Sequence, residues 1–70
     1  MPLLLAPLFK EVRIIKILAN DKVKKHLESL GIVVNATISV VTKNGQSIIC
    51  QVKESRLALD ENIAKKIFIV

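Results

Sequence analysis

The chain has 70 residues, of which 51% are hydrophobic, and it carries a formal net charge of +5 at neutral pH. A chain of this length buries only about 60% of its unfolded surface, and we expect residues 1–70 to form a single small domain. The only cysteine, Cys50, excludes an internal disulfide and fits a reducing compartment such as the cytoplasm. The excess of basic over acidic residues favours an acidic partner, such as nucleic acid, anionic lipid or an acidic protein surface. No apolar run approaches the roughly 20 residues of a membrane-spanning helix, so membrane insertion is not expected.

The first nine residues, 1–9, form a short apolar segment. Pro2 and Pro7 interrupt it and no basic residue precedes it, which argues against a secretory signal. We predict that its leucines, and Phe9 with them, pack over one end of the core. An exposed apolar patch here would also support weak self-association.

A strand and a helix are predicted next. Residues 11–18 are rich in β-branched side chains and predict a strand. Residues 21–30 predict a short amphipathic helix, with Asn20 or Asp21 as its N-cap and Gly31 as a left-handed C-terminal cap. Its apolar residues recur at helical spacing on one stripe, Val23, Leu27 and Leu30.

Residues 32–52 predict a β-hairpin whose register depends on its loop. A two-residue loop at Asn44-Gly45 would place the apolar residues of the two strands on opposite faces. A three-residue loop, residues 43–45, would pair Val40 with Ile48 and bring the apolar residues onto one face. Because burial of one face decides register, we predict the three-residue loop. The residues expected on the buried face are Ile38, Val40, Ile48, Cys50 and Val52.

The remainder of the chain alternates short elements. Residues 53–55 predict a turn, and residues 56–59 a strand. Asp60 is expected to cap a helical turn over residues 61–65, and residues 66–70 to form a last strand. The whole pattern predicts a mainly β, small α+β fold: an SH3-like, partly open β-barrel with one short amphipathic helix and a C-terminal helical turn.

Candidate chemistry is sparse. The only histidine, His26, has no partner at metal-ligand spacing and reads as a surface residue. Cys50 is expected to face inward and fill the core. Gly31 and Gly45 are the only glycines, so no phosphate-binding loop is present. The sequence therefore predicts no catalytic residues, no metal ligands and no cofactor.

The only dense basic cluster is Lys22, Lys24 and Lys25. Such a run is either a solvated helix face or a contact surface for an acidic partner. Specific nucleic-acid binding is disfavoured, because single-strand binders stack bases on aromatic side chains and this chain has only Phe9 and Phe68.

The residues resemble those of the FeoA family, small cytoplasmic accessory proteins of bacterial ferrous-iron uptake. The central segment, residues 24–32, resembles the helix-and-glycine signature of that family. The resemblance extends over essentially the whole chain, in matching order, through residues 2–8 and 12–14, residues 52–60, and residues 64–67 with Val70.

Three departures from the family pattern fall at loops. Phe9 stands where the family usually has glycine before the first strand. Val34-Asn35 replaces a frequent Pro-Gly, although Asn tolerates a left-handed turn position better than most residues. Glu54 replaces a common glycine and would be strained at positive φ.

The resemblance implies an SH3-like barrel that acts by protein contact, without enzyme activity or a bound cofactor. The implied partner is the cytoplasmic part of FeoB, a membrane permease with a GTP-binding domain. We expect Lys24, Lys25 and Arg56 to be contact residues. Three alternatives remain: a repressor-type barrel that binds a peptide or regulatory protein, a basic nucleic-acid-binding barrel, and direct iron binding at His26 or Cys50.

Overall fold

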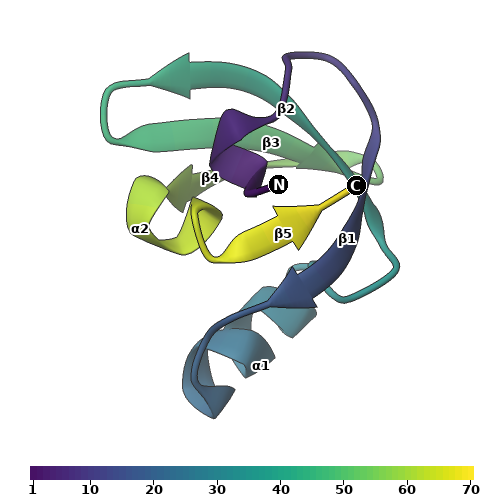
Figure 1. Cartoon of the computed structure of the whole chain (residues 1–70), viewed down its shortest axis with the longest axis vertical. Coiled ribbons are helices and arrows are strands. Elements are labelled where there is room, and N and C mark those ends of the chain that lie inside the picture. Colours follow the sequence, from purple (N-terminus) through teal and green to yellow (C-terminus); the bar gives the residue numbers. More distant parts are fainter.

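The computed structural model describes residues 1–70, which form one antiparallel sheet with two α-helices and a 3-10 helix (Figure 1). The strands follow one another across the sheet in the order β4-β3-β2-β1-β5. This arrangement confirms the predicted small α+β fold. The elements along the chain are η1 (Leu3–Leu5), β1 (Val12–Ile17), α1 (Asp21–Ser29), β2 (Thr37–Asn44), β3 (Ser47–Val52), β4 (Ser55–Asp60), α2 (Glu61–Ala64) and β5 (Ile67–Ile69).

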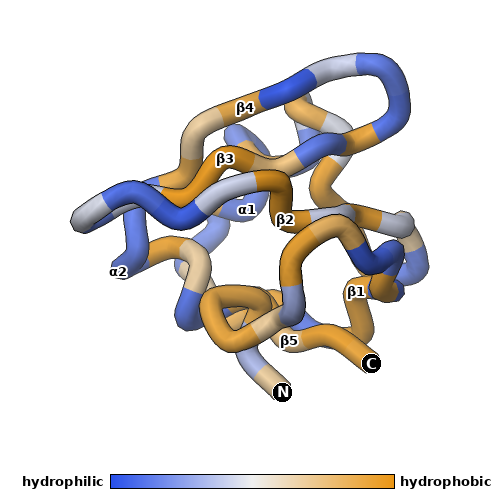
Figure 2. The backbone as a smooth tube through the Cα atoms, turned by 90° about the horizontal axis from the view of Figure 1, so that it is seen from above, coloured by the Kyte–Doolittle hydropathy of each residue, from blue (hydrophilic) through white to orange (hydrophobic).

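A single aliphatic core lies inside the curved sheet. It is one cluster of 15 buried residues, and no polar or charged side chain is buried with them. Along β3 every second residue is buried, which is the alternation expected of a strand with one face inward. In Figure 2 the strands are largely hydrophobic, whereas α1 and the ends of the hairpins are hydrophilic.

The N-terminal segment closes one edge of the sheet. The Ile69 N–H donates to the Met1 carbonyl over 2.7 Å, and Pro2 forms a bridge with Phe68. Leu3 of η1 is fully buried beneath this contact, which confirms the predicted packing of the segment onto the core. The prediction is wrong for Leu5, which is 64% exposed on the outer side of the same helical turn, and for Leu8, which is 46% exposed.

Local capping chemistry sets both ends of α1. The Val23 N–H donates to the Asn20 side-chain oxygen over 2.9 Å, as the cap prediction requires. At the other end, Gly31 has φ +86°, and its N–H donates to the Glu28 carbonyl. The Ile32 N–H donates in turn to Leu27, which completes the paired bonds of a Schellman cap. The helix therefore stops where the sequence predicts, within one residue.

The β2–β3 hairpin has the predicted buried face but not the predicted register. Its turn is Gly45-Gln46, which joins the paired residues Asn44 and Ser47, so neither predicted loop is present. Val41 forms a bulge, because Val40 pairs with Cys50 while Thr42 pairs with Ile49. The extra residue shifts the register by one and returns the apolar side chains to a common face. All five are buried as predicted, namely Ile38, Val40, Ile48, Cys50 and Val52.

Strand β4 pairs with β3 over its whole length without a bulge. The two strands are joined at Lys53-Glu54, where Lys53 rather than Glu54 has positive φ, at +54°. The positive φ therefore falls one residue before Glu54, and the condition for strain at Glu54 is not met. The Asp60 side chain accepts from the Asn62 N–H over 2.6 Å and caps α2 as predicted.

Candidate protein-binding surfaces

The two candidate iron-binding residues, His26 and Cys50, differ in exposure. His26 is exposed on α1, as predicted. No group of three or more His, Cys, Asp or Glu side chains lies close enough to share a metal ion. The Cys50 thiol is fully buried and donates to the Leu57 carbonyl over 3.6 Å. Burial raises the pKa of this thiol from 9.0 to about 11, so Cys50 is a core residue without the thiolate character that reactive cysteines need.

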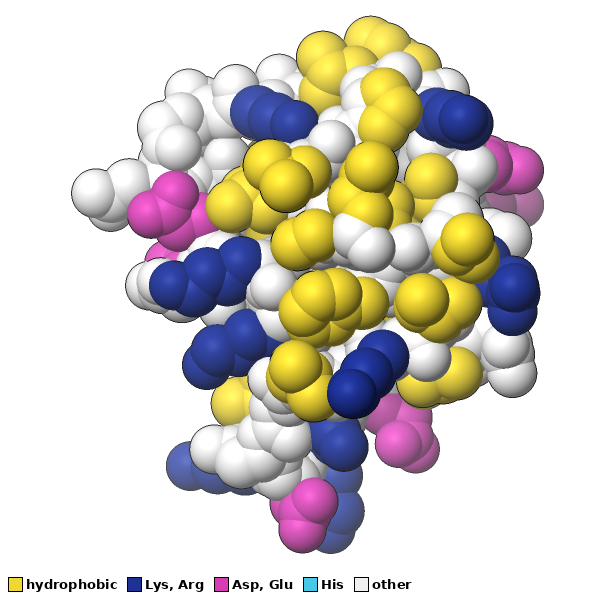
Figure 3. All heavy atoms as spheres, viewed as in Figure 1, with side chains coloured by type: hydrophobic (Ala, Val, Ile, Leu, Met, Phe, Trp, Pro, Cys, Tyr) yellow, Lys and Arg dark blue, Asp and Glu magenta, His cyan; other side chains and the backbone are white.

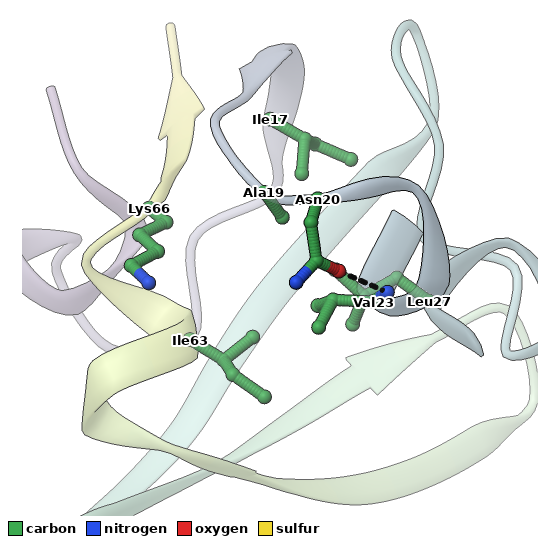
Figure 4. A pocket seen from close by; sticks show the side chains of 7 residues that line it. All are labelled: Ile17, Ala19, Asn20, Val23, Leu27, Ile63 and Lys66. Carbon is green, nitrogen blue, oxygen red and sulfur yellow. Dashed lines mark hydrogen bonds between the residues drawn. The ribbon is translucent and has the colours of Figure 1, made fainter. Parts of the chain in front are cut away.

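The cavities are small or open. The first, of about 70 Å³, lies between α1, α2 and the end of β1, and Figure 4 shows its side chains. It is far below the roughly 300 Å³ of ordinary small-molecule sites. Its lining residues are Ile17, Ala19, Asn20, Val23, Leu27, Ile63 and Lys66.

The largest hollow, of about 400 Å³, lies where the two ends of the described chain meet. It is lined by Met1 and Pro7 from the N-terminal segment, by Lys10 to Val12, and by Ile69 and Val70. This hollow is open and mostly apolar. It belongs to the surface that carries most of the exposed apolar side chains.

The predicted contact residues are all exposed but lie on separate elements. Lys24 and Lys25 are on the outer side of α1, and Lys24 borders a shallow groove of about 180 Å³ with Val33 and Val34. Arg56 is on β4, where its Nε donates to the Gln51 side-chain oxygen over 3.0 Å. The predicted contact residues thus come from two different elements, α1 and β4.

The second candidate surface is the N-terminal apolar face, which we define as Met1, Leu5, Leu8, Phe9 and Val70. Figure 3 shows hydrophobic side chains gathered in a broad band over η1, β5 and β1, with Lys and Arg at its sides. Large exposed apolar patches on small proteins mark interaction sites more often than chance.

Phe9 is the most exposed member of the N-terminal apolar face, at 74%, and its φ is +64°. The prediction that Phe9 is a packing group is wrong. A left-handed backbone at a non-glycine residue costs about 1–2 kcal/mol, and burial of the mostly exposed ring offsets little of this cost. The signal in the sequence was the position itself, where the resembling family usually has glycine. An unburied aromatic ring on a strained residue is the kind of outlier that points to function.

None of the helices is long and apolar enough to span a lipid bilayer.

A family model and several solved structures match this chain. The FeoA domain matches residues 1–70 in full, and no protein with a curated description matches. Among solved structures, the FeoA of Stenotrophomonas maltophilia in complex with zinc is 28% identical, with a TM-score of 0.81 over 100% of this chain and 89% of that one. That protein is described as a procaryotic SH3 domain protein proposed as a bacterial ferrous iron transport activating factor.

Two further structures share the fold at lower identity. An iron uptake regulatory protein, FeoA, is 24% identical, with a TM-score of 0.89 over 99% of this chain and 93% of that one. Iron(II) transport protein A of Clostridium thermocellum is 21% identical, with a TM-score of 0.91 over 99% of this chain and 44% of that one. The SH3-like class predicted from the strand order is therefore confirmed. On the full-length domain match, this chain belongs to the FeoA family.

Proposed function

We propose that this chain is a non-enzymatic, cytoplasmic accessory module of bacterial ferrous-iron uptake that docks onto the cytoplasmic part of a FeoB-type permease. Membership of the FeoA family supports the link to ferrous iron. The description of the Stenotrophomonas maltophilia relative as an activating factor supports a transporter as the partner. Docking is the mode of action because the chain offers exposed binding surface and no cluster of metal-ligating side chains.

The observation that carries the proposal is the N-terminal apolar face with Phe9 at its most exposed point. An aromatic anchor that becomes buried on binding is typical of the few residues that dominate interface energies. The +5 charge adds attraction for an acidic partner surface, and rim charges of this kind act mainly on the association rate and on specificity. In this proposal Phe9 anchors the contact, while Lys24, Lys25 and Arg56 steer it.

The test is a calorimetric titration of the chain into the purified cytoplasmic domain of the FeoB-type permease encoded in the same genome. We expect Phe9→Ser to weaken the affinity at least about tenfold, and Phe9→Leu, which keeps an apolar side chain, to weaken it less. We expect the double variant Lys24→Glu/Lys25→Glu to weaken binding severalfold, with a larger effect at low salt.

The control is Lys43→Glu/Lys65→Glu, which changes net charge by the same amount at two other exposed positions. If this control weakens binding as much as Lys24→Glu/Lys25→Glu, the effect is one of net charge and the lysines of α1 are not contacts. Absence of binding at high micromolar concentration and low salt would contradict the docking proposal. Steeply salt-dependent binding to DNA or RNA instead would favour the nucleic-acid alternative.

A further inference from the structure

The two edge strands of the sheet, β5 and β4, differ in whether another segment covers their outer side. The outer edge of β5 is covered, because the N-terminal segment bonds to it through Met1 and Pro2. The outer edge of β4 (Ser55–Asp60) is not covered. β4 pairs only with β3, and no backbone hydrogen bond from any loop, cap or turn reaches its other side. In Figure 2, β4 runs along the top of the view as the outermost strand.

This open edge lacks most of the usual protection. Natural sheets blunt free edges with charged side chains, especially lysine, and with proline, bulges or very short strands. The only charged side chains of β4 are Arg56 and Asp60. β4 has six residues, contains no lysine, proline or glycine, and keeps a regular register with β3 throughout. A regular open edge of this kind is a template for another strand.

The turn determines which backbone groups face outward. The two-residue turn Lys53-Glu54 makes Val52 and Ser55 a hydrogen-bonded pair, and bonded pairs then alternate along the ladder. Ser55, Leu57 and Leu59 therefore direct their N–H and C=O groups toward β3. Arg56 and Ala58 direct both groups toward the open edge. Asp60 directs its N–H there, while its C=O, as the N-cap carbonyl, accepts the first bond of α2. The side chains of these three residues are exposed.

We propose that the open edge binds a second copy of this chain, so that two β4 strands pair antiparallel about a two-fold axis at Ala58. In this register Arg56 lies opposite the partner's Asp60, and Asp60 lies opposite the partner's Arg56. Ala58 lies opposite the partner's Ala58. The directly paired residues are then those whose free backbone groups face the edge, which for Asp60 is the N–H. This inference goes beyond the proposed function and involves a different surface from the N-terminal apolar face, although Arg56 takes part in both proposals.

The other registers are poorer. If the partner strand is shifted by one residue, the backbone groups that face the open edge lie opposite partner groups that are already bonded to β3. If it is shifted by two residues, Arg56 lies opposite the partner's Ala58 and neither ion pair forms. If it is shifted by four residues, the two Arg56 side chains lie opposite each other. Opposite charges directly across an antiparallel pair stabilise it and like charges destabilise it, so only the register about Ala58 is self-complementary.

Arg56 and Asp60 each have side-chain atoms that make no other hydrogen bond and can form this ion pair. Arg56 uses Nε for Gln51, which leaves its two terminal nitrogens available. Asp60 uses Oδ1 to cap α2 at Asn62, which leaves Oδ2 available. The ion pairs can therefore form without breaking a bond that the isolated chain makes.

The test is sedimentation equilibrium of the isolated chain from micromolar to millimolar concentration, because an interface of one strand from each copy is small and weak. We expect the wild type to approach twice its 7.8 kDa mass at the highest concentrations. Arg56→Asp alone and Asp60→Arg alone each oppose like charges, and we expect each to raise the dissociation constant at least about tenfold. An equimolar mixture of the two variants restores both ion pairs, and we expect it to associate as the wild type does.

Two controls make the result decisive. Lys53→Asp changes net charge as Arg56→Asp does but lies outside the paired residues, and it should leave the dissociation constant unchanged. Because Asp60→Arg also removes the cap of α2, Asp60→Asn serves as a second variant that keeps a capping oxygen and removes the charge, and it should weaken association. A wild type that stays monomeric at millimolar concentration overturns the proposal. So does a mixture of folded Arg56→Asp and Asp60→Arg chains that fails to associate. No permease is present, so neither outcome bears on the docking proposal.

Discussion

Cys50 shows how much a single position is determined by burial. Its thiol has no exposed surface and lies against the backbone of the neighbouring strand at Leu57. Desolvation disfavours the thiolate, which raises the pKa from 9.0 to about 11. The thiol therefore stays protonated in the folded chain at pH values where it ionises in the unfolded chain.

This difference makes stability depend on pH in a predictable direction. Below pH 9.0 the thiol is protonated in both states and has no effect on the pH dependence. Between pH 9.0 and about 11 the unfolded state loses its proton first, so the free energy of unfolding falls as the pH rises. We expect the wild type to lose on the order of 2 kcal/mol relative to Cys50→Ala over this interval.

Urea denaturation of wild type and Cys50→Ala at pH 7, 9 and 11 measures this difference. The comparison between the two proteins removes the contribution of the lysines, which titrate in both. A parallel decline in the two proteins would show that the Cys50 thiol ionises as readily in the folded state as in the unfolded state.

Phe9 shows where residue-level reasoning fails. The flanking aliphatic residues suggested a packing group, yet the ring is 74% exposed. The direction of a side chain on a left-handed residue depends on the backbone path, and here that path is set by the bond from the Phe9 N–H to the Val40 carbonyl. Such a long-range contact leaves no local pattern in the sequence. The exposed lysines of α1, by contrast, follow directly from the helical stripe.

At the scale of elements, the caps were predictable and the hairpin register was not. Asn20, Gly31 and Asp60 act on bonds within a few residues, so their chemistry can be read locally. The hairpin contains the adjacent apolar pairs Val40-Val41 and Ile48-Ile49, which make the alternation ambiguous. The bulge at Val41 resolves this ambiguity only through packing against the rest of the sheet.

The two glycines offer a matched pair of substitutions for testing how turns depend on their surroundings. Both have positive φ, at +86° for Gly31 and +63° for Gly45. A Cβ on Gly31 would meet the Val52 side chain at 3.3 Å, whereas a Cβ on Gly45 would have nothing within 4 Å. We expect Gly45→Ala to cost about 1 kcal/mol from backbone strain alone, and Gly31→Ala to cost about 2 kcal/mol.

Chemical denaturation of the two alanine variants measures the difference. Equal losses of unfolding free energy would mean that the Val52 side chain moves aside freely and that only the backbone strain at positive φ destabilises the variants. A smaller loss for Gly31→Ala than for Gly45→Ala would contradict the close approach of the α1 cap to β3.

At the scale of the whole molecule, the N-terminal segment is structural on one side and available for binding on the other. Within η1, Leu3 is fully buried and Leu5 is 64% exposed. We expect Leu3→Ala to destabilise the fold by about 2–5 kcal/mol, as truncation of a buried leucine does. Leu5→Ala should change stability by no more than about 0.5 kcal/mol.

Thermal or urea denaturation of the two variants distinguishes these roles, and binding to the permease domain gives the complementary readout. If Leu5→Ala weakens binding while leaving stability unchanged, the exposed side of η1 belongs to the docking surface. Comparable destabilisation by the two variants would mean that η1 packs differently from the structure.

The sheet order has a consequence for how the chain is made. β1 lies between β2 and β5, so its second neighbour is translated last among the strands. While a ribosome is still adding residues beyond α2, the side of β1 that faces away from β2 has no hydrogen-bonding partner, and Met1 and Pro2 have no strand to bond to. Contacts of such long sequence separation slow folding, so the nascent barrel stays unfinished until β5 leaves the exit tunnel and docks beside β1.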